Sequence, residues 1–199
     1  MSQYRGCDAR TSADRGADLS GEEPTPVYRY RLWRSWDDRH PGCTWVMLNP
    51  STADALVDDP TIVRCVNFAR AWGFGRIDVF NLYALRATDP RELARHPDPI
   101  GQPDNDLHLL RYLAARPHGA WPAAGVRAHL VHPVLIAAWG VHGGDRGLAL
   151  RRQLAGFRIP VHHIGPLTNG GHPRHPLYLR GDLHPTLMSP PTDAATVGA

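Results

Sequence analysis

The sequence predicts an α/β protein, a three-layer α/β/α sandwich whose short parallel sheet has roughly four strands. Two observations predict it: short apolar runs suited to buried strands recur along the chain, and segments with helical spacing of apolar residues separate them. Strands that alternate with helices form βαβ crossovers, which produce parallel strands covered on both faces. Because the 42% of apolar residues lies mostly in the middle of the chain, we expect one domain at residues 27–188 between disordered tails at 1–26 and 189–199.

Five segments are the expected strands. Residues 28–34 alternate large apolar side chains with Arg, a pattern typical of an edge strand. Residues 43–48 form a nearly continuous apolar run that ends abruptly at Asn49-Pro50, as a buried strand does. The remaining buried strands are expected at residues 76–83, 134–139 and 160–164.

Helix signals follow these strands. Asp59-Pro60 supplies an N-cap and a Pro at the first helical position, and apolar residues then recur at helical spacing up to Gly73. Asp89-Pro90 with Glu92 supplies a cap, a Pro and a capping-box acid for a short helix. Further helices are expected at residues 104–115 and 145–157, and residues 116–130 form a connection of uncertain form.

Composition limits the class of protein. The chain has neither an apolar run long enough to span a membrane nor an apolar segment near its start, so we expect a cytoplasmic protein. Its three cysteines lack the spacing of a disulfide framework or a zinc site. The net charge of +3 supports a phosphate-bearing partner only weakly, because all 22 basic residues are Arg, as a biased genome also produces. No cofactor and no membrane contact are expected, and the oligomeric state stays open, with a monomer favoured.

Four polar clusters fall just past the ends of predicted strands, where ligands bind in parallel sheets. Because these strand ends share one edge of the sheet, convergent clusters indicate a single site. An Asn at a strand end also serves as a strand terminator or backbone cap, and that alternative stays open for Asn49 and Asn81. The clusters span residues 49–54, 81–86, 139–144 and 172–178.

Motifs in these clusters carry a family resemblance. They read MLNPSTAD, DDPT, NLYALRATDP, AAWG and GHPRHPLYL, and together they resemble a bacterial family known only as domain-of-unknown-function family 1643, over about residues 28–180. This resemblance implies no activity.

A more distant resemblance does imply one. An Asn-Pro after the first buried strand, an Asn after the second, an Ala-Trp-Gly after the third and a late His-Pro resemble the uracil-DNA glycosylase superfamily. That resemblance implies a four-stranded parallel sheet with helices on both faces. It also implies that Asn49 positions a water, that Asn81 reads the edge of an extruded base, and that His175 donates a hydrogen bond to the departing base. The sequence departs from the superfamily pattern at Met47, where Gly is preferred, at Ser51-Thr52, and after His175-Pro176.

Further contacts follow from the same resemblance. Pro50 and Tyr83 are expected to bind the base beside Asn81, and the loop after His175-Pro176 is expected to push an apolar wedge into a base stack. Alternatively, Tyr178 and Leu179 begin a core element and never meet nucleic acid. The residues expected to contact phosphate or nucleic acid are Ser51, Thr52, Arg174, Leu177 and Arg180.

The leading hypothesis is therefore a hydrolase, or a transferase of the same fold, acting on the bond between a nucleobase and its sugar in nucleic acid or a nucleotide. The first rival is a non-catalytic module of the same fold that binds a nucleobase or nucleic acid. The second is a metal-dependent phosphoester hydrolase using histidines and aspartates near the strand ends, although no pair has a typical metal-ligand spacing, so no metal is expected. For Asp58-Asp59, helix capping competes with a position of Asp58 at the mouth of the site.

Overall fold

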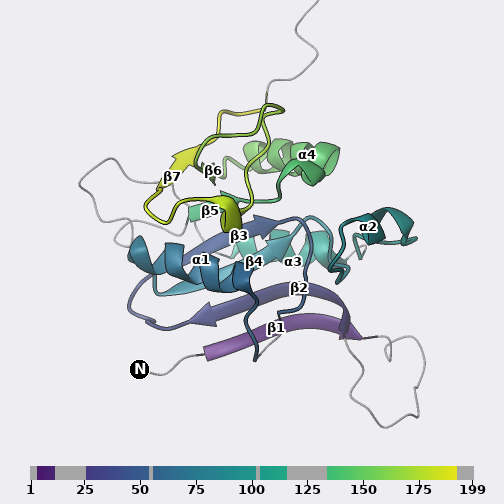
Figure 1. Ribbon diagram of the computed structural model, residues 1–199, viewed down its shortest axis with the longest axis horizontal. Helices are drawn as coiled ribbons and strands as arrows, with labels where there is room; N and C mark the ends of the chain where they lie inside the picture. The colour runs from purple at the N-terminus through teal and green to yellow at the C-terminus, as the bar shows by residue number, and fades with distance from the viewer. Residues whose placement is uncertain (1–3, 12–25, 54–55, 102–103, 116–133, 192–199) are drawn as a thin grey trace, which may run out of the picture.

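The computed structural model describes residues 4–11, 26–53, 56–101, 104–115 and 134–191, and its centre is a seven-stranded mixed sheet in the order β1-β2-β4-β3-β5-β6-β7 (Figure 1). The strands are β1 Tyr4–Thr11, β2 Pro26–Ser35, β3 Gly42–Met47, β4 Arg76–Asn81, β5 Val134–Ala137, β6 Val161–Ile164 and β7 Pro185–Leu187. The helices are α1 Pro60–Ala71, α2 Arg91–Arg95, α3 Asp104–Ala114, α4 Gly144–Gly156 and the short 3₁₀ turns η3 Val141–Gly143 and η4 Pro176–Tyr178.

The predicted α/β class is confirmed, and the four buried runs form β3, β4, β5 and β6. These strands are adjacent and parallel, with β3 paired to both β4 and β5, and β5 paired to β6. Their carboxyl ends therefore share one edge of the sheet. The expected extent of the sheet is wrong, however, because antiparallel strands extend it on both sides: β2 pairs with β4, β1 with β2, and β7 with β6.

Two expectations about the amino-terminal part need correction. Residues 28–34 lie in β2, which is not an edge strand, since it is bonded to β1 on one side and β4 on the other. Residues 4–11, expected in a disordered tail, form β1, which lies at one edge of the sheet in Figure 1. The expectations for residues 1–3, 12–25, 116–130 and 192–199 lie outside the described residues.

Alternating side chains of the strands form two apolar clusters, one on each face of the sheet. One face packs Trp45 and Ile77 against α1 through Phe68, and the other packs Phe80 against α3 and α4 through Tyr112 and Leu154. Because a strand points successive side chains to opposite faces, each buried strand contributes to both clusters. The central strands are thereby covered on both sides.

The predicted cap of α1 is confirmed, whereas α2 begins one residue later than expected, at Arg91, with Pro90 in the cap position. The Asp59 Oδ1 atom accepts a hydrogen bond of 2.8 Å from the Ile62 N–H at the start of α1. Before α2, Asp89 accepts from the Arg91 N–H at 3.0 Å, and its own N–H donates to Glu92 at 3.3 Å. These contacts satisfy N–H groups that the first turn of a helix leaves without partners. Within the described ranges, no helix combines the length and apolar character needed to cross a membrane.

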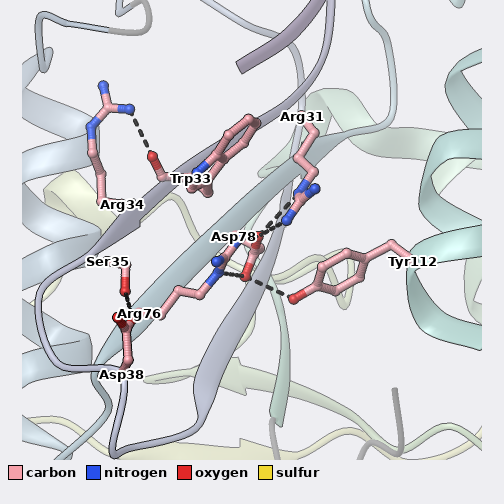
Figure 2. Close-up of polar contacts among 8 residues, drawn as sticks. All are labelled: Arg31, Trp33, Arg34, Ser35, Asp38, Arg76, Asp78 and Tyr112. Atoms are coloured by element: carbon pink, nitrogen blue, oxygen red, sulfur yellow. Dashed lines mark hydrogen bonds and ion pairs between the residues drawn. The ribbon is translucent and has the colours of Figure 1, made fainter. Parts of the chain in front are cut away.

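One charged side chain lies wholly inside the domain. The fully buried Asp78 of β4 accepts hydrogen bonds from Arg31, Arg76 and the Tyr112 hydroxyl, at 2.7 to 3.0 Å (Figure 2). Burial raises the pKa of the Asp78 carboxyl, but the hydrogen bonds and charges of Arg76 and Arg31 outweigh it, so the pKa lies below the usual 3.8. The cluster ties β2, β4 and α3 together.

Candidate functional site

A cavity of about 590 Å³ lies at the carboxyl ends of the parallel strands. Its wall combines residues that end β3 and β4, the segment after β5 and the segment after β6, with the first turn of α1. Asn49, Asn81 and His175, which are far apart in the sequence, all line it. Crevices at this edge of a parallel sheet are the usual binding sites of α/β proteins, and the volume is that of a small-molecule pocket.

Asn49 follows β3 and is held by its own amide. The Nδ2 atom donates to the carbonyl oxygens of Pro50, at 2.9 Å, and Ala87, at 2.7 Å. Because a carbonyl only accepts hydrogen bonds, these contacts fix which end of the amide is nitrogen. The Oδ1 atom accepts no hydrogen bond from the part of the chain that the structure describes. It is therefore an available acceptor, held rigidly at the cavity wall.

Asn81 ends β4 and is 4% exposed. Its side chain lies on the same face of the strand as that of Val79, two residues earlier, which also lines the cavity. No described residue forms a hydrogen bond with the Asn81 amide, whereas its backbone carbonyl accepts one of 3.1 Å from Asn105. Because its side-chain amide lies at the cavity wall and has no partner among the described residues, it is suited to pair with a ligand.

His175 precedes η4 and accepts a hydrogen bond of 3.4 Å at Nδ1 from the Leu177 N–H. Burial lowers the pKa of the His175 imidazole below its usual 6.5, although the Asp59 carboxylate acts in the opposite direction. This lowered pKa favours the neutral ring. Since Nδ1 is the acceptor, we assign the proton to Nε2, which makes this atom a neutral hydrogen-bond donor.

Of the two alternatives for Asp58-Asp59, helix capping is confirmed, and Asp58 does not lie at the site. Asp59 caps α1 and also lines the cavity. Asp58 instead forms an ion pair of 2.6 Å with Arg34 and is not part of the cavity wall. The residue that faces the site is therefore Asp59.

Trp139, which is 2% exposed, forms the wall next to the segment after β5. Two glycines allow the indole to lie there: a Cβ added at Gly143 would be 2.0 Å from Trp139 Cδ1, and one at Gly147 would be 2.6 Å from Nε1. The Gly140 N–H donates to the Pro173 carbonyl at 2.9 Å and so joins this segment to the one that carries His175. The glycines thus serve packing around the tryptophan.

Of the other residues expected to contact the substrate, some lie at the cavity and others do not. Ser51 and Arg174 line it, and so does Tyr178, which is 84% exposed. The alternative to a wedge, in which Tyr178 and Leu179 both enter the core, holds only for Leu179, which is buried in the apolar cluster that includes α1. Pro50, Thr52, Tyr83, Leu177 and Arg180 lie outside the wall, Tyr83 against the apolar core and Arg180 in an exposed ion pair with Asp182.

Sequence patterns did not indicate Arg29, which lines the cavity and is 3% exposed. Its guanidinium donates to the Ala53 carbonyl in the loop after Asn49. Because β2 is antiparallel to β4, its first residues lie at the carboxyl edge of the parallel strands. An Arg in the first half of β2 therefore reaches the site.

The cavity wall combines neutral hydrogen-bonding groups with the charged side chains of Arg29, Asp59 and Arg174. Among the described residues, no group of three or more His, Cys, Asp or Glu side chains is placed to hold a metal ion. What the cavity presents is an amide oxygen at Asn49, a complete amide at Asn81 and an imidazole donor at His175. Together these groups can bind a water molecule and a ring that carries both hydrogen-bond donors and acceptors.

Comparison with known proteins adds one finding. No curated protein and no solved structure matches the chain. A family model described as "Protein of unknown function (DUF1643)" matches residues 29–177, a span that runs from Arg29 in β2 to the turn after His175 and includes the strand-end motifs. Since that match covers well over half of its length, the chain belongs to the DUF1643 family.

Proposed function

We propose that this protein is a hydrolase, or a transferase of the same fold, that breaks the N-glycosidic bond between a nucleobase and its sugar in nucleic acid or a nucleotide. The observation that carries the proposal is that one cavity contains Asn49 from the loop after β3, Asn81 from the end of β4 and His175 from the segment after β6. Each presents the kind of hydrogen-bonding group that this reaction uses.

Breaking the bond leaves a cationic sugar and an anionic base. A neutral donor such as His175 Nε2–H stabilises negative charge on the base that appears only in the transition state. The Asn49 Oδ1 atom can accept a hydrogen bond from the attacking water and so hold it beside the sugar. The Asn81 amide has one acceptor and two donors, which can pair with the edge of a pyrimidine or purine.

The resemblance to the uracil-DNA glycosylase superfamily supports the same proposal. It implies parallel strands with an Asn after the first, an Asn after the second and a His-Pro near the end. Four adjacent strands of this sheet are parallel, and Asn49, Asn81 and His175 follow β3, β4 and β6 in that order. We infer a glycosylase-like core to which β1, β2 and β7 are added.

Mass spectrometry of released bases tests the proposal. The purified protein is incubated with nucleosides, nucleotides and single- and double-stranded oligonucleotides that carry varied modified bases. Release of a free base by the wild type, and its loss in a His175→Ala variant, is the expected result. Duplex affinity that falls with salt would indicate nucleic acid as the substrate, whereas binding of a free nucleotide alone would indicate a nucleosidase. If no base is released from any substrate, the enzymatic proposal is wrong.

A binding module without catalysis is the second candidate, and one observation favours it. Asn49 and His175 both form hydrogen bonds with nearby backbone groups, as purely structural residues do. Such a module would bind free bases or oligonucleotides through Asn81 and leave them intact. Calorimetric binding without any released base identifies this case.

A further inference from the structure

Asp59 has a place in the cavity that its role as a helix cap does not explain. It is the only carboxylate among the residues that form the cavity wall in the described part of the chain. Its Oδ1 atom accepts from the Ile62 N–H at 2.8 Å, and within the described residues its second oxygen accepts no hydrogen bond. Capping therefore uses one oxygen and orients the group, while the other stays available.

The neighbours of this carboxylate are the groups assigned to the reaction. Asp59 and His175 both line the cavity, where the Asp59 carboxylate acts to raise the pKa of the His175 imidazole. Asn49 and Asn81 line the same cavity. The Asn81 side chain, in a residue that is 4% exposed, has no hydrogen-bond partner among the described residues and lines that cavity, so its amide is placed to pair with a polar ligand.

We propose that Asp59 is a further catalytic residue, which stabilises the cationic sugar and accepts the proton of the attacking water. This inference rests on the proposed function. The bond between C1′ and the base nitrogen breaks and its electron pair leaves with the base. The oxygen of a water held by Asn49 then bonds to C1′, and one water proton passes to the free oxygen of Asp59. Asp59 returns this proton to solvent and the anionic base takes one from solvent, so that one water is added in total.

The substitution Asp59→Asn separates capping from charge. Asn caps helices about as well as Asp, because its Oδ1 accepts the same backbone hydrogen bond, but it carries no negative charge and accepts no proton. The matched control is Asp145→Asn, since Asp145 is also a carboxylate in the first turn of a helix, α4, and lies outside the cavity wall. Melting temperature, kcat and KM are measured for both variants with the substrate that the wild type cleaves.

We expect Asp59→Asn to keep the wild-type melting temperature and KM while kcat falls by about 10²- to 10⁴-fold, the usual contribution of a positioned acid or base. Asp145→Asn should keep all three values. Wild-type base release with an unchanged kcat in Asp59→Asn would overturn this inference and leave the proposed function standing. A wild type that releases no base would overturn both, and a fall in melting temperature matching the fall in kcat would show a structural role only.

Discussion

Replacing Asn81 by Ala tests base recognition in the cavity most directly. The amide is almost fully buried and has no hydrogen-bond partner in the described residues, so a bound base would provide its pairing. Removing it leaves the polar edge of that base without its partner in the cavity, at a cost of about 1–3 kcal/mol. This corresponds to a rise in Kd of about 5- to 150-fold. The folded protein loses no side-chain hydrogen bond, so its stability should change little.

Isothermal titration with a panel of free nucleobases measures the effect, and Asn105→Ala is the matched control. The Asn105 Nδ2 atom donates to the backbone carbonyls of Asn81 and Leu82, and its side chain is not part of the cavity wall. We expect this control to lower the free energy of unfolding by about 1–3 kcal/mol, because two buried carbonyls lose a donor. An unchanged Kd in Asn81→Ala, or an equal rise in both variants, would refute base reading by this amide.

Three further predictions concern the site and its support. Asn49→Ala should suppress turnover with little change in Kd, and should also lower the melting temperature, because its amide donates to two carbonyls; parallel kinetics, calorimetry and thermal melts check this. Asp78→Asn should cost about 3–5 kcal/mol in chemical denaturation, since it breaks a buried ion cluster. Because the folded-state pKa of Asp78 is depressed, its contribution is complete above about pH 4 and is lost as pH falls further, a dependence that the variant should lack. Gly143→Ala should lower the free energy of unfolding by about 1–3 kcal/mol, because the added methyl group forces Trp139 to move. An unchanged denaturant midpoint would contradict close packing of Gly143 against Trp139.

Hydrophobic pattern and helix caps predicted the centre of the fold because both act locally. The run that ends at Asn49 had to be buried on both faces, and Asp59-Pro60 fixed the start of α1 within the chain itself. The sheet edges depend on pairing between distant segments, which local pattern does not record. Residues 28–34 have the alternation of an exposed edge, yet β1 covers that edge and Asp78 on β4 pairs with Arg31.

The same physical difference explains which site residues were predictable. Asn49 lies just after β3, Asn81 ends β4 and His175 lies in the segment after β6, so the parallel topology brings these segments to one edge. Arg29 reaches that edge because β2 runs antiparallel to β4. The sequence of a single strand does not show whether it pairs parallel or antiparallel with its neighbour. The sequence predicted Asp59 as a helix cap. Because capping fully explains an Asp before a Pro, the sequence did not indicate a second role for it. Only the arrangement in space shows that Asp59 caps the helix with a single oxygen and also lines the cavity that holds His175. Helix caps at the carboxyl edge of a parallel sheet are therefore candidates for chemistry, since the loop that starts a helix there also borders the site.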